Sequence, residues 1–190
     1  DMGPSWYWMP DVFESFFNDF GKKVSDYYNL KRLDPSYKFY LDDKEFNIPV
    51  LDEDLYKVFE SIEPGSSNKL KDFLNQAKLK YDISMKDFIH LPNHSITEYI
   101  SLDMFKHVFN LDIFKSLRNH IASFFRSKTI KDMLEFPSMF LGGTPNNTPA
   151  LYSLMNYADI VGGTWYPMGG MYEVSKGFEK LSKELGVKHI

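Results

Sequence analysis

The sequence predicts an α+β fold that is mostly helical and contains a small antiparallel sheet. Apolar residues recur at spacings of three and four along most of the 190 residues, and two short runs of β-favouring residues lie close together near residue 40. A hydrophobic content of 43% at this length can supply a sizeable core. We therefore treat residues 1–190 as one domain.

The sheet is expected to centre on a hairpin. The runs at 37–41 and 45–50 favour strands and are separated by two aspartates and a lysine. Pro49 places the second strand at an edge or ends it, because proline cannot donate to a ladder. Extended residues near both ends of the chain are expected to complete the sheet.

The first helix is predicted over 10–26, since Pro10 suits a first helical turn and Asp11 favours the positive end of the helix dipole. Amphipathic patterns predict further helices at 53–63, 67–85, 92–140 with breaks near 110 and 127–128, 149–158, and 171–185. Gly186 suits the position after a helix, and residues 187–190 look like the start of a strand.

Composition excludes several classes of protein. A formal net charge of -4, with basic residues scattered among acidic ones, gives no basic stripe for nucleic acid. The absence of cysteine excludes disulfides, thiolate metal sites and a cysteine nucleophile within this chain. No apolar run approaches the ~20 residues that span a bilayer. We expect a cytoplasmic protein.

No motif marks a catalytic or metal site. His90 and His94 are four residues apart, but Pro92 interrupts a helix between them, so no metal site is predicted. The chain has no GxSxG, GxGxxG or GxxxxGK[ST]. Asp103 and Lys106 are the nearest guess at an acid and base, yet such charges are usually a solvated helix face. The catalytic residues stay unassigned.

Aromatic residues are unusually frequent, at 17% of the chain. They predict either an aromatic-rich core or a surface or tunnel for a large apolar ligand. Two of them, Trp165 and Tyr166, lie in WYPMGGM at 165–171, which enters a helix through two glycines.

Three stretches together resemble the phytoene desaturase (carotenoid desaturase) family of flavin-dependent, amine oxidase-like proteins. The stretches are DMGPSWYWMPDVFESFF, FPSMFLGGTPNNTPALYSLMNYADIVGGTWYPMGGM and MYEVSKGFEKLSKELGV. In that family an Asp-x-Gly-Pro element, a Gly-Gly stretch before an aromatic-Pro-x-Gly-Gly element, and a helix ending in Gly follow in this order. Residues 27–130 match only in general character.

The resemblance implies that the chain is the substrate-binding segment of a two-domain flavoprotein, with the flavin-binding halves absent at both ends. The parent would be an oxidoreductase that dehydrogenates a long isoprenoid, a carotenoid precursor, with FAD as hydride acceptor. FAD is expected in the full-length parent and not on this segment, which alone would be inactive. Such proteins meet lipid peripherally, so a membrane contact is an alternative to core packing for the helical region with Phe105, Phe109, Phe114, Phe124 and Phe125.

The resemblance also suggests site residues. Glycine lacks a β-carbon, so Gly169 and Gly170 would let the backbone approach substrate or flavin closely; a tight turn with ordinary packing is the alternative, and the resemblance favours the site. The residues expected near the substrate or flavin are Trp165, Tyr166, Met168, Gly169 and Gly170, with Trp6 and Trp8 as substrate-lining candidates.

Two other functions stay open. A carotenoid isomerase or oxygenase on the same scaffold would share these residues. A freestanding helical binding or interaction domain would use the aromatic residues as a core or as a docking surface for a partner.

Overall fold

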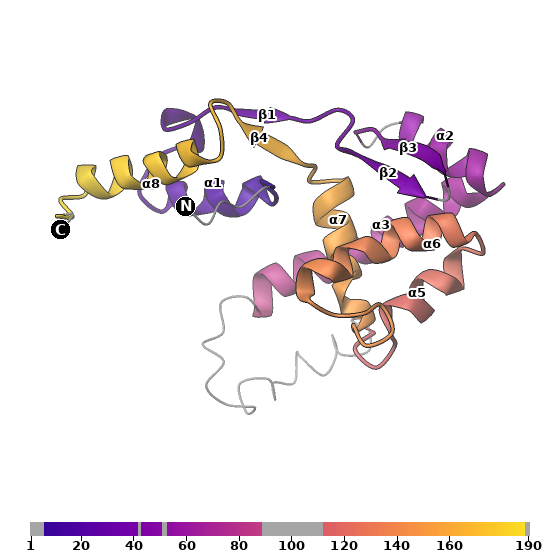
Figure 1. The fold of residues 1–190 in the computed structure, drawn as a ribbon. Coiled ribbons are helices and arrows are strands. Elements are labelled where there is room, and N and C mark those ends of the chain that lie inside the picture. The colour runs from indigo at the N-terminus through magenta and orange to yellow at the C-terminus, as the bar shows by residue number, and fades with distance from the viewer. Residues whose placement is uncertain (1–5, 42, 51–52, 89–111, 189–190) are drawn as a thin grey trace.

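The computed structural model describes residues 6–41, 43–50, 53–88 and 112–188. The predicted α+β fold is confirmed (Figure 1). The helices are α1 (Pro10–Asn18), α2 (Glu53–Ile62), α3 (Ser66–Ile83), α5 (Leu117–Phe124), α6 (Lys128–Glu135), α7 (Leu154–Ile160) and α8 (Tyr172–Glu184). The strands are β1 (Leu30–Arg32), β2 (Tyr37–Leu41), β3 (Lys44–Ile48) and β4 (Trp165–Pro167). Short helical turns are η1 (Val24–Asp26), η2 (Ser84–Phe88), η4 (Phe136–Leu141) and η5 (Ala150–Ser153).

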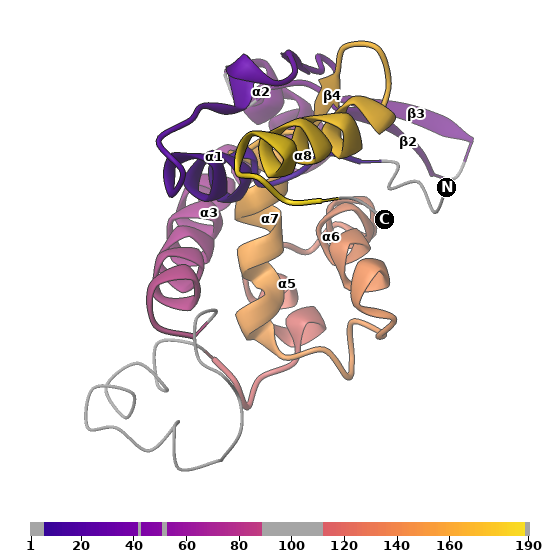
Figure 2. The ribbon, with the colours of Figure 1, turned by 90° about the vertical axis from the view of Figure 1, so that its left-hand side faces the viewer.

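The larger part of the structure, here called the helical unit, contains α2, α3, α5, α6, α7 and the β2–β3 hairpin. Helix α3 packs against α2, α5 and α7, and Figure 2 shows α3 next to α7. The core of this unit includes Leu55, Phe59, Leu70, Phe73 and Ile121, all almost fully buried. Burial of these faces stabilises the unit by roughly 1.5–3 kcal/mol for each large apolar side chain.

The smaller part, here called the terminal unit, joins the two ends of the described chain. Strand β1 pairs antiparallel with β4, and α1 packs beside α8 over Phe17 and Leu181 (Figure 1). Gly177 makes this packing possible, because a β-carbon there would lie 2.8 Å from a ring carbon of Tyr28.

The sheet prediction was right about the hairpin and wrong about its extent. Strands β2 and β3 form the predicted hairpin within residues 37–50, and Tyr37 lies opposite Ile48. The extended residues near the ends form a separate two-stranded sheet, in which Arg32 lies opposite Trp165. Tyr7 adds an isolated bridge to Trp165.

Helix boundaries also differ from expectation. Helix α1 ends at Asn18 and not near residue 26, because Gly21 turns the chain with φ of 67°. The break expected near 127–128 is present, where Phe125 adopts an extended conformation after α5. Residues 187–188 are not in a strand. Of the helix predicted over 92–140, residues 92–111 lie outside the described part, and Asp103 and Lys106 lie there too.

Candidate functional site

An apolar hollow lies where the two units meet. It has a volume of about 510 Å³ and is lined by Trp6, Trp8, Phe140 and Met155, which we call the aromatic hollow. The tryptophans come from the segment before α1, Phe140 from η4 and Met155 from α7. Three segments distant in sequence therefore build one site.

The extended backbone before α1 explains why both tryptophans face the hollow. Side chains alternate along an extended segment, so Trp6 and Trp8 share one side while Tyr7 faces the other. Tyr7 is 2% exposed and packs in the core of the terminal unit. Its carbonyl accepts a hydrogen bond from the Trp165 amide at 3.0 Å, which fixes the segment against β4.

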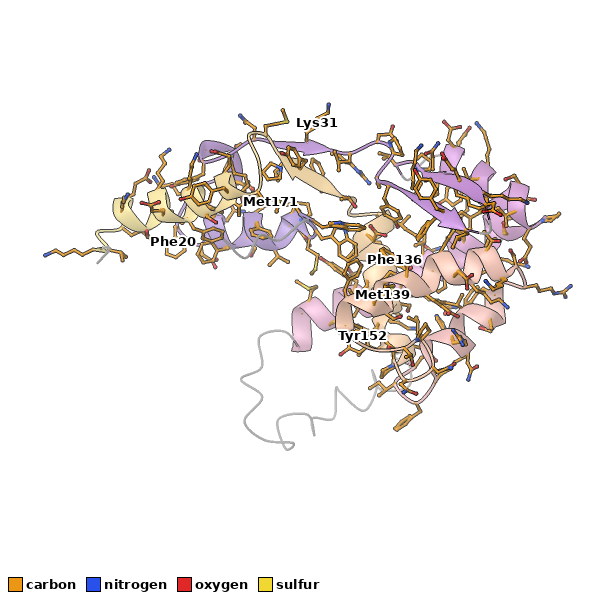
Figure 3. The ribbon with its side chains drawn as sticks, viewed as in Figure 1. Phe20, Lys31, Phe136, Met139, Tyr152 and Met171 are labelled. Atoms are coloured by element: carbon orange, nitrogen blue, oxygen red, sulfur yellow. The ribbon has the colours of Figure 1, made fainter. Side chains whose placement is uncertain are left out.

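The rings of the hollow contact one another closely. Ring centroids are 5.4 Å apart for Trp6 and Trp8, 5.5 Å for Trp6 and Phe140, and 5.0 Å for Trp8 and Phe140. Phe136 lies behind Trp6 at 6.0 Å and also contacts Phe39 of the hairpin at 5.4 Å. Figure 3 shows Phe136 near the middle of the molecule, close to the junction of the two units.

A buried polar network supports this aromatic surface. Asp159 is 2% exposed and accepts hydrogen bonds from the Tyr37 hydroxyl and, at 3.4 Å, from the Thr164 hydroxyl. Thr164 in turn accepts a bond of 3.2 Å from the indole nitrogen of Trp8. The ring of Tyr37 stacks on Trp6 with centroids 5.5 Å apart. Both tryptophans are thus linked to one carboxylate.

Burial sets the protonation behaviour of this network. Burial raises the pKa of Asp159 to about 6, and the hydrogen bonds from Tyr37 and Thr164 oppose part of that rise. Burial and the neighbouring Asp159 charge raise the pKa of Tyr37 well above its ordinary value. Tyr37 therefore remains a hydrogen-bond donor at neutral pH.

The structure places the segments of the two predicted groups side by side, because Tyr7 bridges Trp165, but their side chains have different surroundings. Trp6 and Trp8 line the aromatic hollow, but Trp165 packs against the core of the terminal unit and donates its indole N–H to the Gly162 carbonyl at 2.8 Å. Tyr166 and Met168 are 42% and 52% exposed. Their proximity to substrate or flavin stays a prediction.

The glycine pair forms the turn into α8. Gly169 and Gly170 have φ of 99° and 108°, which side-chain-bearing residues rarely adopt. The Gly170 amide bonds the Pro167 carbonyl at 2.9 Å, and its own carbonyl accepts from Glu173 at 3.0 Å. The backbone conformation alone accounts for both glycines.

Sequence reasoning missed Phe140, Met155 and Asp159. Phe140 and Met155 lie on predicted helices, where periodicity treats apolar residues as core. Asp159 carried a weak signal, since it is an isolated charge in the otherwise apolar run ADIVGG.

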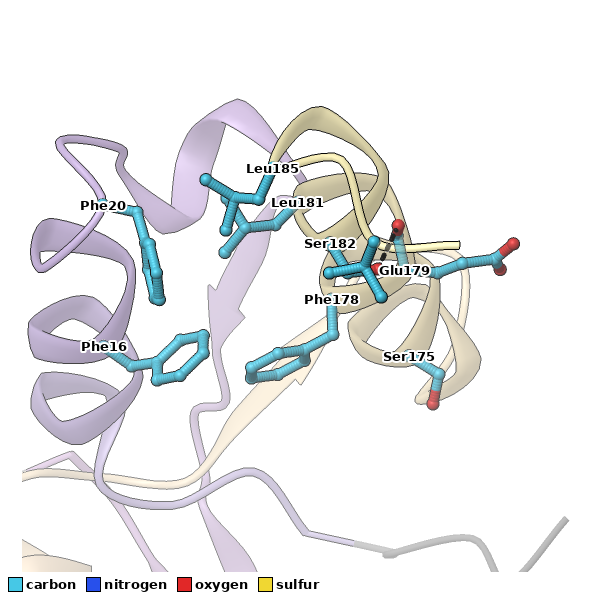
Figure 4. A pocket seen from close by; sticks show the side chains of 9 residues that line it. Phe16, Phe20, Ser175, Phe178, Glu179, Leu181, Ser182 and Leu185 are labelled. Atoms are coloured by element: carbon cyan, nitrogen blue, oxygen red, sulfur yellow. Dashed lines mark hydrogen bonds between the residues drawn. The ribbon is translucent and has the colours of Figure 1, made fainter. Parts of the chain in front are cut away.

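A second hollow, the α1–α8 groove, has a volume of about 580 Å³. It is lined by Phe16, Phe20, Ser175, Phe178, Glu179, Leu181, Ser182, Leu185 and Val187. Figure 4 shows the rings of Phe16 and Phe178 facing each other and Ser175 pointing away. Most of this lining is apolar, but it includes Glu179 and two serines, and the buried carboxylate network lies outside the groove.

A third feature is a buried lysine in the helical unit. Lys80 is 1% exposed and its Nζ contacts the Asp112 carboxylate at 2.9 Å, His120 Nε2 at 3.3 Å and the Ala150 carbonyl at 3.2 Å. Burial lowers the pKa of His120 to about 4, so the imidazole is neutral. The contacts of Lys80 join α3, α5 and η5, and Lys80 lines neither of the two hollows described above.

The described residues do not fit the dinucleotide part of FAD. Their strands form two antiparallel pairs, whereas a dinucleotide site uses a parallel βαβ unit with a glycine-rich turn. Among the same residues no group of three metal-ligating side chains occurs. Nor is any described helix long and apolar enough to cross a bilayer.

Known proteins are similar to this chain over nearly its whole length. No family model matches the chain. It is 35% identical over 191 residues to a carotenoid 3,4-desaturase of Haloarcula japonica, matching 100% of the chain and 39% of that protein. A zeta-carotene-forming phytoene desaturase of Myxococcus xanthus is 28% identical, matching 99% and 37%. A 4,4'-diapophytoene desaturase of Staphylococcus aureus strain Newman is 30% identical, matching 98% and 38%.

The chain is therefore homologous along its length to carotenoid desaturases, as its sequence indicated. It spans less than two fifths of the length of each of these relatives. Desaturases are oxidoreductases, and those of this family are generally FAD-dependent.

Proposed function

We propose that this chain is the substrate-binding part of a phytoene desaturase-like oxidoreductase, and that the aromatic hollow holds a section of a long isoprenoid chain. The observation that supports the proposal most strongly is the hollow itself. Trp6, Trp8, Phe140 and Met155 present an apolar, mostly aromatic lining to solvent without a charged side chain among them.

The chemistry of the hollow suits a hydrocarbon. An isoprenoid polyene offers no hydrogen-bonding groups, so affinity must come from apolar area removed from water, at about 25 cal/mol for each Å². Ring faces such as those of Trp6 and Trp8 also provide dispersion contacts with a conjugated chain. The volume of about 510 Å³ is within the range of small-molecule pockets. A long isoprenoid therefore has only one section inside the hollow.

The part that these residues play is to hold the chain and exclude water. FAD, when bound in the full protein, supplies the hydride acceptor of a dehydrogenation. The described residues do not fit its dinucleotide, so no step through FAD is assigned to them. Asp103 and Lys106 are not assigned a role.

Peripheral contact with a membrane is part of the proposal, because substrates of this kind dissolve in lipid. Of the aromatic residues first considered for that contact, Phe125 is buried in the core and Phe124 packs against it, while Phe114 is 94% exposed. Exposed apolar side chains just after α1 and just after α8, such as Phe20 and Leu185, offer a second surface.

The test expresses the protein as its gene encodes it in a bacterial host that accumulates phytoene. The wild type is expected to convert phytoene into more unsaturated products, each step removing two hydrogens, and Trp8→Ala should reduce conversion about tenfold. Tyr40→Ala removes an exposed aromatic residue that lines neither the hollow nor the surfaces considered for membrane contact, and it is the control. Unchanged phytoene with flavin-loaded wild-type protein would contradict the proposal.

Product mass separates the alternatives. Loss of hydrogen indicates a desaturase, gain of oxygen an oxygenase, and an unchanged mass with altered chromatography an isomerase. Polyene binding without any product indicates a binding domain.

A further inference from the structure

Trp6 and Trp8 are only partly buried, so packing alone does not fix their orientation. Each tryptophan is linked to Asp159 through one intermediate residue. Asp159 lies on α7, one turn beyond Met155 of the hollow. The carboxylate is therefore the common anchor of two walls of the site.

The link to Trp8 passes through Thr164. A threonine hydroxyl has one hydrogen, and in the structure it is directed to Asp159 Oδ1 at 3.4 Å. The remaining lone pairs then face the indole N–H of Trp8, which donates at 3.2 Å. Because Thr164 is 4% exposed, water does not compete freely for these bonds. Asp159 thus sets the direction of the hydroxyl that holds Trp8.

The link to Trp6 passes through Tyr37. The Tyr37 hydroxyl donates to Asp159 Oδ2, and its ring stacks on Trp6 with an interplanar angle of 29°. Tyr37 also meets Phe136 at 6.1 Å between centroids. The carboxylate holds the ring against which Trp6 rests.

We infer that Asp159 is a positioning residue for the aromatic hollow: its buried carboxylate holds Trp6 and Trp8 in the orientation in which they receive the apolar chain. The identity of the ligand rests on the proposed function. The positioning itself does not, because it concerns the orientation of two tryptophans in the ligand-free protein. A site built this way is pre-organised, so less ordering is needed when a ligand binds.

The first experiment measures ring order without ligand. The protein as its gene encodes it is labelled with 5-fluorotryptophan, and the ¹⁹F resonances are assigned with Trp6→Phe, Trp8→Phe and Trp165→Phe. Asp159→Ala should shift or broaden the resonances of Trp6 and Trp8 more than that of Trp165, because the indole of Trp165 bonds the Gly162 carbonyl and not the Asp159 network. No change, or an equal change of all three, would overturn the inference.

A second variant keeps the test valid if Asp159→Ala fails to fold. Thr164→Val cuts only the link to Trp8, so it should perturb the Trp8 resonance more than that of Trp6, whose ring also stacks on Tyr37. Asp112→Asn is the matched control, since it alters a carboxylate paired with buried Lys80 and distant in the network from both tryptophans. If Thr164→Val left Trp8 unchanged, the inference would be wrong.

The second experiment measures affinity with phytofluene, a linear polyene that quenches tryptophan fluorescence by energy transfer, dispersed in phosphatidylcholine vesicles. Asp159→Ala is expected to bind about tenfold more weakly, and Asp159→Asn to lose less affinity, because its amide oxygen still accepts a hydrogen bond from one of the two hydroxyls. In a Trp8→Phe background the effect of Asp159→Ala should shrink markedly, since partners in one network are not additive.

The two experiments separate the two claims. Wild-type protein that binds no phytofluene would contradict the proposed function of the hollow, and the ¹⁹F spectra would still decide the role of Asp159. Wild-type binding that Asp159→Ala leaves unchanged in its folded fraction would overturn the positioning role alone.

Discussion

The ring of Tyr37 stacks on the ring of Trp6, with centroids 5.5 Å apart. Tyr37 belongs to the β2–β3 hairpin of the helical unit, and Trp6 belongs to the segment that precedes α1 in the terminal unit. The contact therefore joins the two units at the edge of the aromatic hollow. Substitutions in the hairpin should therefore alter the aromatic hollow.

Tyr37→Phe should lower the free energy of unfolding by about 1–3 kcal/mol, because it removes a donor from a buried carboxylate while the ring stays in place. Denaturation in urea measures the change. Tyr40→Phe is the control, since Tyr40 lies on the same strand but is 69% exposed, and it should have little effect. Equal effects of the two substitutions would show that the hydroxyl contact with Asp159 contributes nothing.

Asp159 makes stability depend on pH in a defined window. Its pKa is raised from 3.8 to about 6, so the folded state favours the protonated form, and the associated stability is present below pH 4 and lost as pH rises to about 6. The unfolding free energy of Asp159→Asn minus that of the wild type should therefore increase by about 2–3 kcal/mol as the pH rises through this window. Urea denaturation of both proteins across the window measures this difference. A constant difference would contradict it.

His120 acts in the opposite direction. Burial lowers its pKa from 6.5 to about 4, so stability is present above pH 6.5 and is lost as pH falls towards 4. His120→Gln cannot gain a proton and should remove up to about 3 kcal/mol of that acid-induced loss. Thermal unfolding at a series of pH values measures it. A wild-type curve parallel to that of His120→Gln would show that the imidazole does not titrate in this way.

Gly170→Ala should cost about 1–3 kcal/mol of stability, because φ of 108° is strained for alanine. Affinity for phytofluene at the aromatic hollow should stay unchanged in the folded protein, since Gly170 does not line it. Thermal unfolding and the energy-transfer titration measure the two quantities. Lost affinity with unchanged stability would favour the sequence-based prediction that the glycine pair lies against substrate or flavin.

The sequence predicted the parts of the fold that depend on local patterns. The hairpin followed from β-favouring residues on either side of a polar turn, and α8 followed from apolar periodicity ending at Gly186. The first helix was extended too far because Phe20 continues the periodicity, whereas Gly21 ends the element. The spacing of apolar residues does not show that Gly21 adopts a positive φ, so periodicity alone extends the helix past its true end.

Two of the residues that line the aromatic hollow were named from the sequence, and their role at a substrate site stays a prediction. Trp6 and Trp8 came from the WYW segment, but Phe140, Met155 and Asp159 reach the same place from more than 130 residues away. Such contacts are set by how α7 and η4 pack against the chain before α1. The spacing of residues in one sequence does not reveal how these distant segments pack.

The measurement that tests the account most directly is photocrosslinking with a diazirine-bearing linear isoprenoid, followed by mass mapping of the labelled peptides. Fragmentation of the labelled peptides should place the adducts on Trp6, Trp8 and Met155, all reduced in Asp159→Ala. Adducts confined to the α1–α8 groove, at Phe16 or Leu185, would contradict the assignment of the aromatic hollow as the substrate site.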